Sequence, residues 1–171
     1  MAWTDLTTRS TGYKVTAANW NEIVNNINQM DTWTAFTPAL EASTTNPTLG
    51  SGSSAVGRYW VVGSATAGGL CVAQVKITFG SSGVNEGSGN YRIADLPFDI
   101  VVGSYTGVPV GTGYVEDSGA SARWLASPVI GAAGYVELAL NNEAARSVRH
   151  NVPFTFAASD FIAAQFTFPI A

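Results

Sequence analysis

Hydrophobic positions along the chain follow two different periods, and the first is helical. Within "ANWNEIVNNINQM" (18–30) the large apolar residues of one stripe fall three or four positions apart, at Trp20, Ile23, Ile27 and Met30. This spacing places them on one side of a helix, and Thr16 offers an N-cap hydroxyl in front of it. The other side is mostly asparagine, a poor helix former. We predict one short helix whose stripe needs a covering surface.

The sequence leaves two surfaces open for that stripe. The helix could lie on the protein's own β-domain, or pack against symmetry mates or a host surface. Its 3-4-3 spacing matches a coiled-coil seam, but it lasts for less than two heptads and does not specify an oligomer by itself.

From Trp33 onward the pattern becomes that of β-strands and turns. In "VAQVKITF" (72–79) even and odd positions alternate, so Gln74 and Lys76 face away from Val75 and Ile77. "WTAFTPAL" (33–40) reads as an edge strand or extended arm broken at Pro38, and "EASTTNPTLGSGSSAVG" (41–57) as turns. Further short strands rich in β-branched and aromatic residues are predicted in "RYWVVGS", "NYRIADLPFDIVVG", "GTGYVEDS", "ARWLASPVI", "GYVELAL" and "DFIAAQFTFPI".

Many short strands without a second helix predict an all-β fold, an antiparallel β-sandwich or barrel, preceded by an N-terminal arm and one short α-helix. We divide the chain into residues 1–33, for attachment and trimerisation, and a β-domain at 34–171. A length of 171 residues suits one core-forming domain of this kind.

Composition changes the picture in one respect. Hydrophobic residues make up 46% of the chain but charged residues only 12%, about half the usual share, and Lys14 and Lys76 are the only lysines. So little charge would leave an isolated monomer with an adhesive surface. We therefore expect subunits or a larger assembly to cover much of the surface.

Several classes of protein are disfavoured. The net charge is −4 with no evident basic patch, which argues against nucleic-acid binding. The start "MAWTDLTTRS" lacks the pattern of a signal peptide, and no apolar run approaches the roughly 20 residues of a membrane span. Cys71, the single cysteine, is expected to be a buried thiol in a strand and cannot form an internal disulfide.

Candidate catalytic residues are sparse. A Ser-His-Asp arrangement would have to use His150, the single histidine, which we interpret instead as a turn residue near Arg146 and Arg149, with a small anion-binding patch as a minor alternative. Glu116 and Asp117 are adjacent near a hairpin tip, where neighbouring side chains point to opposite faces rather than forming a catalytic pair.

Metal and phosphate sites are equally weakly indicated. Zinc would need more ligands than one histidine and one cysteine. Calcium could use oxygens of Asp95, Asp99, Glu116 or Asp117, but the chain has no 12-residue ligand loop. The glycine-rich stretches lack Gly-Lys-Ser/Thr and are expected to be hairpin turns. We expect no enzyme activity, cofactor or metal.

Four phrases in order resemble a family of tailed-bacteriophage virion surface proteins. They are "TGYKVTAANWNEIVNNINQMDTWTAFTP" (11–38), "NPTLGSGSSAVGRYWVVG" (46–63), "VKITFGSSGVNEGSGNYRIADLP" (75–97) and "PFTFAASDFIAAQFTFPIA" (153–171). The likeness is weak over 98–150, and the longer loop "GSATAGGL" (63–70) stands where the family has a polar Gly-Lys turn.

This resemblance implies a trimeric β-sandwich, often of jelly-roll type, on the virion surface. Family members serve as head decorations, head fibres or minor tail proteins. The expected partners are two further copies of the chain and phage capsid or tail proteins, with a host surface glycan for a minor tail protein acting as a receptor-binding module. The protein would be made in the host bacterial cytoplasm.

The predicted site residues form two groups. The attachment or oligomer interface is expected to include Trp20, Ile23, Ile27, Met30, Trp33 and Phe36, because large apolar side chains dominate binding energy at interfaces. Tyr105, Tyr114 and Trp124 could stack on sugar rings. The alternative is that these three fill the core or the trimer seam.

Overall fold

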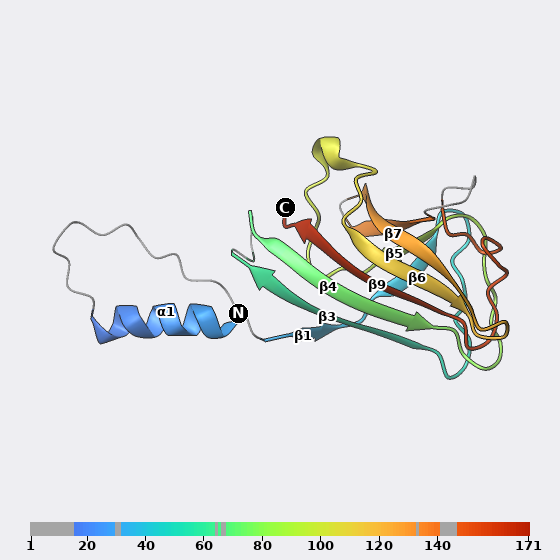
Figure 1. The fold of residues 1–171 in the computed structure, drawn as a ribbon, viewed down its shortest axis with the longest axis horizontal. Helices are drawn as coiled ribbons and strands as arrows, with labels where there is room; N and C mark the ends of the chain where they lie inside the picture. Colours follow the sequence, from blue (N-terminus) through green and yellow to red (C-terminus); the bar gives the residue numbers. More distant parts are fainter. Residues whose placement is uncertain (1–15, 30–31, 64, 66–67, 133, 141–146) are drawn as a thin grey trace.

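A computed structural model describes residues 16–29, 32–63, 65, 68–132, 134–140 and 147–171. Within these residues the protein is mostly antiparallel β-sheet with one α-helix (Figure 1), which confirms the all-β prediction. The elements are α1 (Ala17–Gln29), β1 (Thr34–Phe36), β2 (Ala39–Ala42), β3 (Ser54–Val62), β4 (Leu70–Thr78), β5 (Tyr91–Ala94), the 3-10 turn η1 (Gly103–Tyr105), β6 (Gly111–Asp117), β7 (Ala122–Ala132), β8 (Tyr135–Leu140) and β9 (Phe161–Pro169).

The nine strands form one hydrogen-bonded sheet in the order β1-β3-β4-β9-β6-β7-β8-β5-β2. The sheet curls into a half-barrel, as Figure 1 shows. Its two edge strands, β1 and β2, are consecutive in the chain and separated only by Thr37 and Pro38. Pro38 has no N–H to donate to a ladder, so the chain can leave β3 at this point and pair with β5.

The concave face of the sheet holds the core. The alternation predicted for β4 is confirmed, since Ala73, Val75 and Ile77 are buried while Lys76 is exposed. The largest buried side chains include Phe79, Tyr91, Phe156, Phe166 and Phe168. Burying such rings removes apolar surface from water, the main stabilising term of a fold without disulfides.

Cys71 lies in β4 and is a buried free thiol, as the sequence predicted. Burial raises the pKa of this thiol to about 12. Cys71 therefore stays protonated at neutral pH and behaves as a small apolar core residue.

The turn prediction for residues 41–57 was too long. Strand β2 extends through Ala42 and β3 already begins at Ser54, because this segment pairs at both ends with neighbouring strands. The middle of the segment does turn. At Gly50 the φ angle is +84°, and a Cβ there would lie 2.4 Å from the carbonyl oxygen of Ser82, so only glycine fits.

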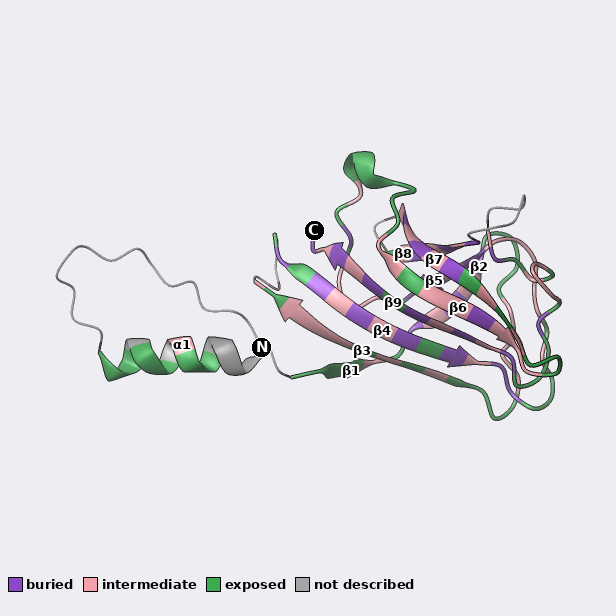
Figure 2. Ribbon diagram, viewed as in Figure 1, coloured by how far each residue is buried: buried purple, intermediate pink, exposed green. Residues whose placement is uncertain are grey.

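Helix α1 begins directly after Thr16, whose carbonyl oxygen accepts a hydrogen bond from the N–H of Trp20 at 3.0 Å. The helix lies beyond the end of the sheet rather than on it (Figure 1). Figure 2 shows that its described side chains are mainly exposed, and Trp20 is 61% exposed. The sequence left open whether the helix lies on the β-domain or packs against another surface. In the structure α1 does not lie on the β-domain.

Candidate binding surface

The convex face of the sheet carries several exposed apolar side chains. Leu125 on β7 is 68% exposed and Val56 on β3 is 58% exposed. Val62 and Leu70 also face outward, and they pair with each other across β3 and β4. In Figure 1 no described helix or strand is layered over this convex face.

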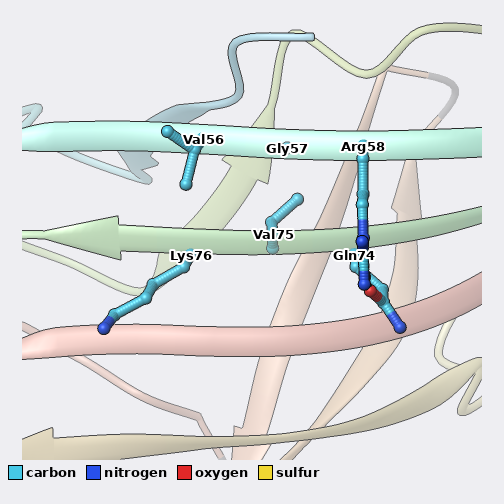
Figure 3. A pocket seen from close by; sticks show the side chains of 6 residues that line it. All are labelled: Val56, Gly57, Arg58, Gln74, Val75 and Lys76. Atoms are coloured by element: carbon cyan, nitrogen blue, oxygen red, sulfur yellow. Dashed lines mark hydrogen bonds between the residues drawn. The ribbon is translucent and has the colours of Figure 1, made fainter. Parts of the chain in front are cut away.

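A shallow hollow of about 300 Å³ lies on this face, over β3 and β4. It is lined by Val56, Gly57, Arg58, Gln74, Val75 and Lys76. Figure 3 shows the Arg58 side chain of β3 reaching towards Gln74 on β4, while Lys76 extends from β4 towards β9, the neighbouring strand on the other side. We call these six residues, with Trp33 and Gln165 beside them, the convex hollow.

A ladder of planar polar groups crosses the convex hollow. Register places Arg58 opposite Gln74, and Gln74 opposite Gln165 on β9. The Nε of Arg58 donates to Oε1 of Gln74 at 2.8 Å, and Nε2 of Gln74 donates to Oε1 of Gln165 at 2.7 Å. Gln165, at the end of the ladder, is exposed.

Each cation of the convex hollow packs on an aromatic ring. The guanidinium of Arg58 lies 4.6 Å from the ring centroid of Trp33, which packs edge-on against Trp60 at 6.3 Å. The ammonium group of Lys76 lies 4.2 Å from the centroid of Phe161. These contacts hold the two cations in place without neutralising them.

Charge is distributed unevenly over the sheet. Strands β1, β3, β4 and β9 contain two charged residues, Arg58 and Lys76, and no Asp or Glu. Arg92 pairs with Glu41 at 2.9 Å, and Arg123 pairs with Glu116. Among the described residues neither Arg58 nor Lys76 has a carboxylate partner. The convex hollow is therefore locally positive on a chain whose net charge is −4.

Sequence reasoning found no basic patch because these two cations are 18 positions apart. Only the β3–β4 register, in which Lys76 lies opposite Val56 and two places from the partner of Arg58, brings them together. The sequence alone shows only that Arg58, Gln74 and Lys76 interrupt two strands that are otherwise mostly apolar.

The structure separates the predicted attachment residues into two sets. Trp20 is exposed on α1 and Ile23 is half-buried. Phe36 belongs to the β-domain, where its ring covers Gly57 and packs edge-on against Tyr59 at 6.0 Å. Trp33 likewise packs on Trp60. The side chain of Ile27 and all of Met30 lie outside the described residues.

The three aromatics proposed for glycan stacking do not come together. Tyr105 is 56% exposed in η1, at the end of the sheet where the C-terminus lies (Figure 1). Tyr114 is half-buried on the convex face against Phe161. Trp124 packs against Phe154 at 4.9 Å beside the core, as the alternative interpretation held. They do not form one stacking site.

Two of the candidate catalytic residues, Glu116 and Asp117, have structural partners. Glu116 pairs with Arg123, and Asp117 accepts the N–H of Ala120 at 2.9 Å. His150 has a buried Nδ1 without a hydrogen-bond partner, and Arg146 lies outside the described residues. Across the part of the chain that the structure describes, no three His, Cys, Asp or Glu residues are grouped as metal ligands.

Within the same described ranges, no helix is long and apolar enough to cross a membrane. Comparison of the chain with protein-family models, with curated proteins and with solved structures finds no match.

Proposed function

We propose that the protein is a structural component of a tailed-bacteriophage virion, a capsid decoration or head-fibre protein. In this proposal its N-terminal segment attaches to the particle and its β-domain is displayed as a homotrimer. The sequence resemblance supplies the class of protein. The observation that carries the proposal is Trp20, which is 61% exposed on α1 although the helical spacing predicts that its side chain needs a covering surface.

Helix α1 is expected to be only marginally stable as an isolated helix. Five of its thirteen residues are asparagine, each costing roughly half a kcal/mol relative to alanine. Isolated helices of this length are marginal in water even with better sequences. Burying one large apolar side chain such as Trp20 contributes about 1.5–3 kcal/mol. A partner surface that covers the stripe would stabilise the helix and bind the protein at the same time.

The direction of the β-domain fits attachment at the N-terminal end. Strand β1 enters the sheet from the end where the C-terminus lies. Pro169, at the end of β9, pairs with the start of β4, and the start of β4 pairs with the end of β3. Because β1 runs antiparallel to β3, the start of β1 points to the same end of the sheet. The loops at the opposite end include residues 43–53, 80–90 and 118–121 (Figure 1). A particle-bound protein would present these loops outward.

For the β-domain we propose a jelly-roll-type sandwich as the finer description of the curled sheet. The support is the segment from β1 to β2, which leaves one edge and joins the other after two residues. Strands that pass between sheets in this way form the corners of β-sandwiches. The buried rings from both halves of the sheet then meet in one core.

Gold-labelled antibody against the β-domain tests the proposed location on purified phage particles. We expect label on the head of intact particles. Cleavage before Thr32 should release the β-domain, and the label with it, from the shell. Label at the tail would favour the second candidate, a minor tail protein that recognises a host surface glycan. Particles without label would contradict both.

A further inference from the structure

We propose that the convex hollow is a binding site for an acidic saccharide, a chain of sugar rings that carries carboxylate groups. This inference concerns the face of β3, β4 and β9, and it does not depend on where on a particle the protein sits. It assigns a ligand class to residues that the predicted attachment and glycan contacts did not include, apart from Trp33.

The charge of the convex hollow selects an anion. Arg58 and Lys76 occupy diagonal positions on adjacent strands, with backbones about 7–8 Å apart and no carboxylate of the described chain against either. The other two arginines of the described strands, Arg92 and Arg123, each have an acidic partner. Two cations that stay unneutralised on an acidic protein form a place where negative charge is attracted.

The remaining groups select a sugar rather than a simple anion. Gln74 and Gln165 continue the hydrogen-bonded ladder that starts at the Arg58 guanidinium, and Gln165 is exposed at its end. Such flat, multiply donating groups suit the hydroxyls of a sugar ring. Trp33 and Val56 expose apolar surface beside them, against which the C–H face of the ring can pack.

A second copy of this chain fits the convex hollow less well. Around a twofold axis through this face, Arg58 and Lys76 would lie near their own counterparts, and like charges in contact are unfavourable; the threefold axis of the proposed homotrimer would instead bring different faces together. The rest of the face does expose apolar residues such as Leu125, so self-association is included as an outcome of the test.

The experiment measures binding of three probes to the 171-residue protein by titration calorimetry at low ionic strength. The probes are a hexamer of galacturonic acid, a neutral glucose hexamer and a glutamate hexapeptide. We expect binding of the galacturonate hexamer only, weakening as salt is added. The double variant Arg58→Gln/Lys76→Gln should lose affinity by about tenfold or more, since each cation supplies a charged hydrogen bond.

Two controls keep this result specific. Arg92→Gln removes one positive charge from β5, near the opposite edge of the sheet, and should leave the affinity unchanged. Gln165→Ala should weaken binding without any change of charge. Melting temperatures of all variants identify any that fail to fold, and Gln165→Ala on the exposed face serves if the double variant is unstable.

Three results would overturn the proposal. The first is equal affinity for the glutamate peptide, which would reduce the site to a general anion patch. The second is binding that survives Arg58→Gln/Lys76→Gln. The third is self-association of the protein that the double variant abolishes, which would assign the convex hollow to a second copy.

Discussion

Helix α1 and strand β4 are both short amphipathic segments, yet they end in opposite environments. In β4 the apolar side chains Cys71, Ala73, Val75 and Ile77 are buried against the rest of the sheet. In α1 the largest apolar side chain, Trp20, is 61% exposed. An amphipathic pattern therefore shows only that a segment needs a covering surface. The structure shows that β4 is covered by its own chain and that Trp20 of α1 is not.

The largest expected effect is on the stability of the β-domain, the region whose apolar side chains are covered by its own chain. Phe156 is buried and its ring lies 5.3 Å from Phe79, 5.1 Å from Tyr91 and 4.5 Å from Phe154, between centroids. Phe156→Ala should lower the free energy of unfolding by about 3–5 kcal/mol, because it removes a large ring and leaves a cavity. Urea unfolding followed by tryptophan fluorescence measures this. A loss below about 1 kcal/mol would show that the cluster is not part of the core.

A smaller effect is expected at Asp160, a buried carboxylate that joins two loops. Its Oδ1 accepts the N–H of Ser118 at 2.8 Å and its Oδ2 accepts the N–H of Ala157 at 2.7 Å. Asp160→Asn replaces one acceptor with a donor, so one buried N–H loses its partner. Unfolding free energy should fall by about 1–3 kcal/mol.

The pH dependence sharpens the prediction at Asp160. Burial raises the pKa of this carboxyl above its usual value, and the two backbone hydrogen bonds partly offset that rise. A raised pKa in the folded state adds stability that is present at low pH and lost as pH rises through that pKa. The stability gap between the native protein and Asp160→Asn should thus be larger near about pH 4 than at neutral pH. A gap that widens with rising pH would contradict the assignment.

The smallest effect on folding is expected in the helix. Trp20→Ala should change the unfolding free energy of the β-domain by less than about 0.5 kcal/mol, because the side chain is exposed in the single chain. The same change should weaken trimer formation or particle binding by about 2 kcal/mol or more, as loss of a buried tryptophan does at interfaces. Light scattering and particle-binding assays measure the second effect. Equal oligomerisation of both proteins would remove Trp20 from the interface.

The sequence predicted the fold well where local pattern decides it. Period-two alternation identified β4, and the Asn-Pro and glycine positions identified the turns around Gly50. It could not predict that β1 and β2 pair with opposite edges, because this depends on the curl of the entire sheet and on two residues, Thr37 and Pro38. The turn prediction for 41–57 was too long for the same reason, since pairing with distant strands extended β2 and β3 into it.

The candidate site was less predictable than the fold. Trp20 was found from helical periodicity, which is local. The convex hollow joins Arg58, Gln74 and Gln165 from three strands, and its positive charge exists because no Asp or Glu lies on those strands. Charge counted along the chain shows a net −4 and conceals it. Trp33 and Phe36 pack on β3, a contact that chain order alone could not show, and their part in an attachment interface stays a prediction.

A shortened chain beginning at Thr32 tests the central claim most directly, that the N-terminal segment attaches the protein while the β-domain folds by itself. This start keeps Trp33 on Trp60 and removes α1. Its binding to particles that lack the protein is measured beside that of the 171-residue chain, with circular dichroism and melting temperature as the check on folding. We predict a β-folded protein of nearly unchanged melting temperature that no longer binds the particles. A shortened chain that binds as well as the 171-residue chain, or one that does not fold, would contradict the account.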